Sequence, residues 1–382
     1  MKKETKIIHT SNYKGRESLY GSINPPIVRA STVAFESYNQ MSNPPADKVA
    51  YGRYGIEPMR TFRKAISDLE GAYDSIITSC GVQAVSISLI GVLKAGDHVL
   101  IADNVYDPAS RFGTAFLPNF GIEVTFFDAL KLDSLKDIIK DKTKAIFFEV
   151  PASLTMEFPD IDAIVSFAKK HSLISIIDNT WGAGYLFKPL DLGVDISVQA
   201  ITKYVVGHAD TMMGSVAIKN KDLFKTVQSR ATIFGISVSP DDIYLALRGL
   251  KTLAVRLNQH HDNAMEVVAF LDAHPLIDEV FCPALSTSPG YEHWKKHCTK
   301  TNGLISFTFK ENYCDAYIGK FIDNLKFFPA GYSWGGFESI ISMAKPIRSV
   351  SGWDKNRVIR LHIGLEASED IIQDLDDSLK TI

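Results

Sequence analysis

Several features are scarce in this chain of 382 residues, and each scarcity argues against a class of protein. The four cysteines (Cys80, Cys282, Cys298 and Cys314) form no Cys-x-x-Cys pair, which argues against a structural zinc site and a disulfide framework. No apolar run approaches the roughly 18 residues of a membrane-spanning helix. The net charge is −3, so no positive field is present to hold nucleic acid or an anionic bilayer. We therefore expect a cytoplasmic protein with no nucleic-acid partner, no membrane partner and no bound metal.

The composition is that of a folded chain with more than one domain. Hydrophobic residues make up 46% and charged residues 22%, the balance of a globular protein. At about 150 residues per domain, the length predicts two to three domains. Residues 1–57 contain Pro25, Pro26, Pro44 and Pro45 and few periodic apolar segments. We expect this part to be an extended arm with at most a short helix and little core of its own.

Short apolar runs alternate with amphipathic stretches between residues 58 and 250. Strands are expected at 98–102, 123–127, 145–150 and 173–178, and helices at 133–140 and 161–170. Continuous apolar strands separated by helices are typical of a parallel sheet that is covered on both faces. The pattern predicts a large α/β domain with a mostly parallel sheet.

A long helical pattern from about residue 240 to 274, broken once, leads into the C-terminal part at 251–382. Strands are expected there at 304–309, 339–344 and 358–363, and a closing helix at 371–379. This mixture predicts a smaller α+β domain. His260 and His261 lie within the long helical pattern and are expected to face solvent or an interface.

Small residues precede an apolar helical pattern in the segment Ser79 to Ala84. The first N–H groups of a helix and its dipole attract a phosphate group. Ordinary helix capping uses the same residue types, so this segment alone leaves both interpretations open.

Two polar residues follow expected strands and could carry chemistry. Asp178 ends the run that starts at Leu173, and the ligands of parallel sheets gather beyond the carboxyl ends of strands. An Asx turn or a helix cap explains such an aspartate equally well. Lys203 comes shortly after the run from Val194 to Ala200 and directly after Thr202. A lone lysine is more often a surface residue, but one at a strand end can form a Schiff base.

Together, the carboxylate, the amine and the phosphate-type helix start meet the needs of a pyridoxal phosphate site. The ring nitrogen must stay protonated to withdraw electrons, and a carboxylate such as Asp178 would keep it so. The aldehyde requires an amine for covalent attachment, which Lys203 would provide.

Seven segments resemble motifs of the Cys/Met-metabolism family of pyridoxal-phosphate enzymes, in the same order along the chain. They are Tyr51–Pro58, Cys80–Ala84, Asn104–Asp107, Asp178–Trp181, Thr202–Tyr204, Gly207–Asp210 and Arg360–Glu366. The resemblance covers nearly the whole chain and implies the PLP-dependent transferase-like fold, or fold type I. It also implies an arm at 1–57 that contacts a neighbouring subunit, a large cofactor-binding domain at 58–250 and a C-terminal domain at 251–382.

The same resemblance implies roles for individual residues. Lys203 would be the Schiff-base lysine, Asp178 the partner of the pyridinium nitrogen, and Tyr106 a catalytic aromatic residue stacked on the ring. Five residues would contact phosphate: Gly81, Val82 and Thr202, and, toward the neighbouring subunit's cofactor, Tyr51 and Arg53. Four residues would bind substrate: Arg360, which pairs with the α-carboxylate, and Tyr332, Ser333 and Trp334.

Two positions depart from the family pattern. Many relatives have serine where this chain has Ala200, and the common Gly-Asn-Pro-Thr stretch is replaced here by Gly55 to Pro58. Both departures affect the expected phosphate contacts, and neither removes a catalytic atom.

Within the family, the segments Pro151–Glu157 and Tyr332–Glu338 are most similar to bacterial cystathionine β-lyases. This implies cleavage of L-cystathionine to homocysteine, pyruvate and ammonia, a step of methionine biosynthesis. The same cofactor also supports cysteine-S-conjugate β-elimination, γ-lyase or γ-synthase chemistry and amino-acid racemisation. An alternative of another class is a non-enzymatic regulatory protein that retains the fold. The family also implies a small amino-acid substrate and a homo-oligomer, built as a tetramer of two dimers.

Overall fold

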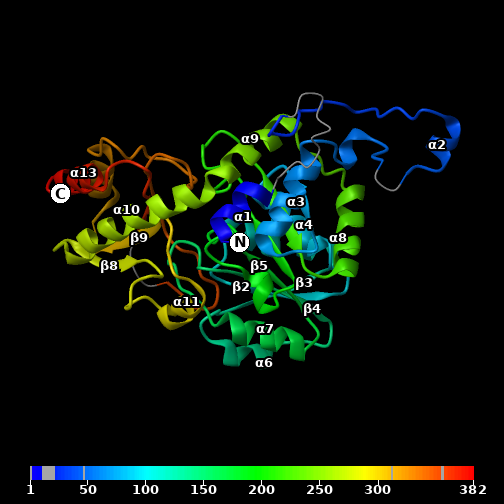
Figure 1. Cartoon of the computed structure of the whole chain (residues 1–382). Helices are drawn as coiled ribbons and strands as arrows, with labels where there is room; N and C mark the ends of the chain where they lie inside the picture. Colours follow the sequence, from blue (N-terminus) through cyan, green and yellow to red (C-terminus); the bar gives the residue numbers. More distant parts are fainter. Residues whose placement is uncertain (1, 11–21, 46–47, 311–312, 354–356) are drawn as a thin grey trace.

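The computed structural model describes residues 2–10, 22–45, 48–310, 313–353 and 357–382, and within them it forms two sheets with helices around them (Figure 1). The larger sheet has seven strands in the order β1-β7-β6-β5-β4-β2-β3. Their bounds are β1 Asp74–Thr78, β2 His98–Ala102, β3 Glu123–Phe127, β4 Thr143–Glu149, β5 Ile174–Asp178, β6 Ile196–Gln199 and β7 Gly214–Ile218. The strands from β6 to β3 run parallel, and β7 lies antiparallel to both β1 and β6. The predicted mostly parallel sheet is confirmed.

Apolar side chains fill both faces of this sheet. Leu100 in β2 and Phe147 in β4 are fully buried, as continuous apolar strands under helices must be. The main helices around the sheet are α3 Met59–Glu70, α4 Gly81–Ile90, α7 Ile161–Lys170, α8 Lys221–Ile233 and α9 Pro240–Lys251. The helix expected at 133–140 is shorter: a 3-10 turn at Leu132–Ser134 leads into α6, Leu135–Ile138. Only Leu135 of α6 is buried, so little packing sustains a longer helix.

The smaller sheet is antiparallel, with the strand order β10-β11-β9-β8. Its strands are β8 Ile277–Phe281, β9 Leu304–Phe309, β10 Ile340–Ala344 and β11 Val358–His362, and its helices include α10 Leu253–Ala273, α12 Asp315–Asp323 and α13 Ser368–Leu379. Helices α10, α12 and α13 contribute to the second apolar core with this sheet. The expected smaller α+β part is therefore present. Figure 1 shows α10 running from the large-sheet region toward the region that contains α13.

The long helical pattern is broken once, at Thr252 between α9 and α10. The expectation that His260 faces solvent or an interface is wrong for solvent, because its side chain is fully buried in this chain. Its Nδ1 lies 2.8 Å from the carbonyl oxygen of Ile363, and its ring packs beside Tyr204 and His362. A hydrogen bond at Nδ1 and aromatic packing offset part of the cost of burial, while Nε2 has no hydrogen-bond partner among the described residues.

The N-terminal arm contains more helix than expected. Besides α1 (Lys3–Thr10), it forms α2 (Tyr38–Ser42) and a 3-10 turn at Gly52–Tyr54, so the expectation of at most one short helix is wrong. Helix α1 packs on the large-sheet region through the buried Ile7, and Glu4 accepts a hydrogen bond of 3.0 Å from the Tyr185 hydroxyl. Helix α2 lies away from the rest of the chain (Figure 1). Residues 11–21 of the expected arm lie outside the described residues.

No helix in the described ranges is both long and apolar enough to cross a membrane. The division of the chain at 57/58 and 250/251 into an arm and two domains stays a prediction.

Because Leu100 is buried and Leu130 is exposed, the same truncation to alanine should lower the free energy of unfolding by different amounts at the two positions. Leu100→Ala removes a fully buried side chain and should lower the free energy of unfolding by about 2–5 kcal/mol. Leu130→Ala is the matched control, because Leu130 is 45% exposed, and it should cost no more than about 1 kcal/mol. Urea unfolding followed by circular dichroism measures both values. Equal losses would contradict the burial of Leu100 of β2 in the core.

Candidate functional site

Asp178 lies at the carboxyl end of β5 and is almost completely buried. The Thr180 backbone N–H and hydroxyl both donate to its Oδ1, at 3.0 and 2.6 Å. Burial raises the pKa of Asp178, while the Thr180 hydrogen bonds and the positive charge of Lys203 act in the opposite direction. These partners favour the carboxylate form despite its burial. Thr180 also binds the neighbouring loop, since its hydroxyl accepts a hydrogen bond of 2.8 Å from the Ala200 backbone.

Lys203 follows β6, the next strand in the sheet. Its Nζ donates to the Ser333 hydroxyl at 2.5 Å and lies 5.3 Å from the centre of the Trp334 ring. Burial above all, and then the charge of Arg360, lower the pKa of Lys203 to about 8, although the charge of Asp178 acts in the opposite direction. A lysine with such a pKa presents a sizeable fraction of neutral, nucleophilic amine slightly above neutral pH.

The segment that carries Ser333 lies directly on Lys203. A Cβ added to Gly335, whose φ is +87°, would lie 2.9 Å from the Cα of Lys203, so glycine is required at this close approach. Ser333 itself has φ +91°, which is unusual for a residue with a side chain. Its carbonyl oxygen accepts a hydrogen bond of 3.2 Å from Arg360 Nη2, which helps to hold this strained backbone.

Arg360 and Tyr106 interact electrostatically with each other. Arg360 lies in β11, opposite Ser342 of β10, and burial lowers the pKa of its guanidinium while Tyr106 raises it. Tyr106 is 45% exposed, and its backbone N–H donates to Glu149 at 2.5 Å. Burial, Glu149 and Asp178 raise the pKa of the Tyr106 phenol, in that order, so the phenol is neutral at ordinary pH. Tyr106 and Lys203 thus both interact electrostatically with Asp178 and with Arg360, so these four side chains lie near one another.

The expected phosphate-binding start of α4 lies against the loop that leads to Lys203. A Cβ added to Gly81 would lie only 2.5 Å from the Cβ of Ala200, so the backbone of the helix start fits there only as glycine. The Cys80 thiol caps the helix by accepting a hydrogen bond from the Gln83 N–H at 3.4 Å. The side chain of Val82 in the first turn is 39% exposed. The N–H groups of Gly81 and Val82, which precede the capped Gln83, have no acceptor within the helix, as at any helix N-terminus.

The Thr202 hydroxyl already has hydrogen-bond partners within the chain. It donates to the Met213 carbonyl oxygen at 3.1 Å and accepts from the Met213 N–H at 2.8 Å. Its hydrogen is therefore used within the protein. A contact to a phosphate oxygen would require the hydroxyl to turn away from Met213.

Tyr51 and Arg53 have partners elsewhere in the chain. Arg53 Nη1 donates to the Thr232 carbonyl oxygen near the end of α8 at 2.9 Å, and its guanidinium lies 5.0 Å from the Tyr54 ring centre. Tyr51 forms an isolated bridge with Thr32. Among the described contacts, neither residue touches Lys203. Tyr332 is 92% exposed, next to the partly buried Ser333. The roles assigned to all these residues from the sequence stay predictions.

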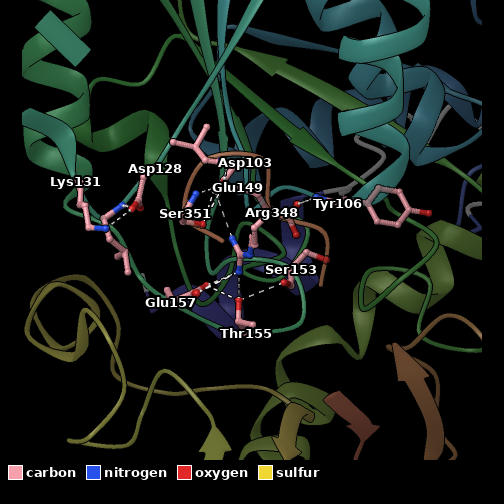
Figure 2. A network of polar contacts seen from close by, with 12 residues as sticks. Asp103, Tyr106, Asp128, Lys131, Glu149, Ser153, Thr155, Glu157, Arg348 and Ser351 are labelled. Carbon is pink, nitrogen blue, oxygen red and sulfur yellow. Dashed lines mark hydrogen bonds and ion pairs between the residues drawn. The ribbon is translucent and has the colours of Figure 1, made fainter. Parts of the chain in front are cut away.

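Sequence reasoning missed several polar residues around the site, including Glu149, Thr180 and Arg348. Glu149 ends β4 and pairs in register with Asp178 at the end of β5, so the strand-end argument that identified Asp178 could also have found it. Arg348 carried no local signal. Figure 2 shows its guanidinium among Asp103, Thr155 and Glu157, with Glu149 near them and the ring of Tyr106 pointing away from this group.

Comparison with known proteins extends these observations. The sequence model of the family described as Cys/Met metabolism PLP-dependent enzyme matches residues 4–380. Cystathionine beta-lyase MetC of Escherichia coli (strain K12) is 38% identical over 376 residues, which cover 95% of each chain. An L-alanine/L-glutamate racemase of Wolbachia pipientis wMel is 35% identical over 376 residues, which cover 94% of this chain and 93% of the racemase.

A solved structure of cystathionine gamma-lyase from Lactobacillus plantarum, in complex with L-serine, superposes with a TM-score of 0.92 and 29% identity. The match covers 100% of this chain and 99% of that chain, so the expectation of a fold-type I architecture is confirmed over the whole length. The chain therefore belongs to the Cys/Met-metabolism family of pyridoxal-phosphate-dependent enzymes.

Proposed function

We propose that this enzyme is a carbon–sulfur β-lyase that cleaves L-cystathionine to homocysteine, pyruvate and ammonia. The observation that carries the proposal is the contact of Lys203 Nζ with the Ser333 hydroxyl, beside Trp334. It joins the reactive amine to the segment whose sequence is most similar to bacterial β-lyases. Relatives named cystathionine beta-lyase, at 38% identity over nearly the whole chain, support the same choice.

The residues present fit pyridoxal phosphate. Lys203 offers a partly neutral amine for the aldehyde, because burial lowers its pKa to about 8. Asp178 offers a buried carboxylate with two Thr180 donors, suited to a pyridinium nitrogen. The start of α4 at Gly81 and Val82 offers backbone N–H groups to a phosphate, and the glycine lets this turn pack against Ala200, where a Cβ would collide. When bound, the cofactor supplies an electron sink for the carbanion at the substrate Cα.

The side chains of this chain would then divide the work. Arg360, held on the Ser333 carbonyl oxygen, would bind the substrate α-carboxylate in a two-pronged contact. Lys203 Nζ would take the proton from the substrate Cα and later give a proton to the sulfur that leaves Cβ. Its lowered pKa suits both transfers, because each protonation state is populated near pH 8. The Ser333 hydroxyl would orient the amine between the two steps.

The proposal includes a homo-oligomer, built as a dimer of dimers. Tyr51 and Arg53 make no described contact with Lys203 of their own chain, which supports a role of these residues at the phosphate of a neighbouring subunit's cofactor. Exposed apolar side chains on α2, Tyr38 and Met41, support an arm that is covered by another copy. We also place the enzyme in the cytoplasm, in keeping with four free cysteines.

Amino-acid racemisation is the second candidate. It requires proton-transferring groups on opposite faces of the substrate, and Tyr106 is a neutral phenol in the same electrostatic neighbourhood as Lys203. The similarity to a protein named L-alanine/L-glutamate racemase supports keeping this candidate. Elimination from other cysteine S-conjugates and γ-chemistry use the same Lys203 and Arg360. A non-enzymatic role is disfavoured, because Lys203, Asp178 and Arg360 are all present in one site.

Substrate comparison separates these reactions. We expect the highest kcat/KM for cystathionine, with pyruvate as the keto acid, when purified holoenzyme is assayed with cystathionine, cystine, methionine and alanine. A higher kcat/KM for cystine would favour a general β-lyase. Formation of 2-oxobutyrate from methionine, or of D-alanine from L-alanine, as the fastest reaction would contradict the β-lyase proposal.

Substitution of Lys203 tests the covalent role of its amine. Lys203→Ala should abolish the visible absorbance band of the attached cofactor and reduce β-elimination by about 10²–10⁴-fold or more, because the amine also transfers protons. The control is Lys170→Ala, since Lys170 is an exposed lysine at the end of α7. It should keep both the band and the activity. An unchanged spectrum in Lys203→Ala would refute the assignment.

The lowered pKa of Lys203 predicts its reactivity in the cofactor-free protein. Only the neutral amine is acylated, so labelling of Lys203 should rise with pH and reach half its maximum near pH 8. Exposed lysines should reach half of their maximal labelling near pH 10.4, the ordinary pKa of lysine, within about one pH unit. Mass spectrometry of peptides after brief acylation across a pH series gives both profiles. A Lys203 profile that coincides with that of exposed lysines would show that the amine is not desolvated.

A further inference from the structure

Arg348 is a buried cation that the proposed reaction does not use. It belongs to the connection between β10 and β11, and its side chain is only 4% exposed. Its Nη2 lies 3.1 Å from both carboxylate oxygens of Glu157 and also donates to the Thr155 hydroxyl. Its Nη1 lies 3.8 Å from Oδ1 of Asp103 (Figure 2). A guanidinium so far removed from water is tolerated only with such partners.

Asp103 also holds the β10–β11 connection, through hydrogen bonds to a second part of it. Its side chain is 1% exposed, and its Oδ2 accepts hydrogen bonds from the backbone N–H groups of Val350 and Ser351, at 2.9 and 2.7 Å. The Ser351 hydroxyl also donates to Oδ2 at 2.9 Å. Asp103 directly follows β2 of the large sheet, whereas Arg348 and Ser351 belong to the part of the chain that forms the small sheet. The contacts therefore join the two sheets.

Asp103, which holds the connection, lies on the same edge of the large sheet as the candidate site. Strands β5, β4 and β2 are neighbours, and their carboxyl ends place Asp178, Glu149 and Asp103 along one edge. Burial and the charge of Asp178 raise the pKa of Glu149 well above its ordinary value, while its bond to the Tyr106 N–H and the charge of Arg348 lower it. Arg348 thus acts on the carboxyl that holds the Tyr106 backbone.

The connection also lies between β10 and β11 in the chain. Arg348 and Ser351 precede β11, the strand that carries Arg360, and β11 pairs with β10 on the other side of the connection. Arg360 in turn holds the Ser333 carbonyl oxygen, next to the hydroxyl that contacts Lys203. A shift of this connection would therefore move the guanidinium expected to bind substrate.

We propose that Arg348 is a positioning residue, which locks the β10–β11 connection onto Asp103 and Glu157 and so sets the positions of Arg360 and Tyr106 relative to Lys203. The inference rests on the proposed function only in taking Arg360 as the group that binds the substrate carboxylate. The lock itself consists of contacts within the chain and can be tested without any substrate.

The test compares Arg348→Met with Arg357→Met in the holoenzyme. Arg357 is the matched control, because it lies in the same connection but forms an exposed ion pair with Asp315, which contributes little. Arg348→Met should raise the KM for cystathionine about 10- to 100-fold, with a smaller change in kcat, because the binding group is displaced and the proton-transferring amine is retained. Hydrogen exchange should become faster in residues 345–353 but not in β4 and β5. Arg357→Met should leave both properties as they are.

Two further variants keep the outcome decisive. Arg348→Lys retains the charge but loses the forked geometry, so it should show an intermediate KM and faster exchange confined to residues 345–353. If hydrogen exchange in Arg348→Met is faster throughout the chain, that variant is unfolded as a whole, and the result for Arg348→Lys then tests the proposal. Asp103→Asn should reproduce the effect, and its combination with Arg348→Met should be less than additive because both act through one contact network.

The failure of the lock and the failure of the proposed function give different results. A normal KM and normal exchange in Arg348→Met, with a wild-type enzyme that cleaves cystathionine, would overturn the lock alone. If the wild type does not cleave cystathionine, the exchange measurement and the double-variant comparison still decide on the lock. Equal exchange rates in residues 345–353 of the Met, Lys and wild-type proteins would then overturn it.

Discussion

The arrangement of the site depends on one short contact, the hydrogen bond of 2.5 Å from Lys203 Nζ to the Ser333 hydroxyl. Lys203 follows a strand of the large sheet, and Ser333 belongs to the segment before β10 of the small sheet. Glycine at position 335 permits the close approach, and Arg360 holds the strained backbone of Ser333. The amine is thereby desolvated, which lowers its pKa, as the proposed roles of nucleophile and base require.

Charge balance supports this arrangement. The large sheet presents the carboxyl groups of Asp103, Glu149 and Asp178 along one edge, and the C-terminal part presents the guanidinium groups of Arg348 and Arg360. Groups of one sign alone would be costly to bury together, so the two parts of the chain complement each other. The substrate contact proposed for Arg360 and the contacts of Arg348 with Asp103 and Glu157 thus both pair a guanidinium with a carboxylate.

Much of the fold could be predicted, because most strands are continuous apolar runs and Asp178 and Lys203 follow two of them. Strands β1 and β7 gave no such signal, since β1 contains Ser75 and Thr78 and β7 begins with Gly214, residues that do not mark a buried strand. The buried ring of His260 has its hydrogen-bond partner at Ile363, far along the chain. Glu157, a partner of Arg348, lies 191 residues away from it in the sequence. Contacts of that kind leave no local pattern in a sequence.

The most direct test is to trap the cofactor on the chain. Reduction of the holoenzyme with borohydride fixes an aldehyde to the amine that holds it, and peptide mapping by mass spectrometry then identifies the lysine. We predict that the modification is found on the peptide that contains Lys203 and that the reduced enzyme is inactive. Modification of a different lysine, with Lys203 unmodified, would contradict the assignment of this amine and the site built around it.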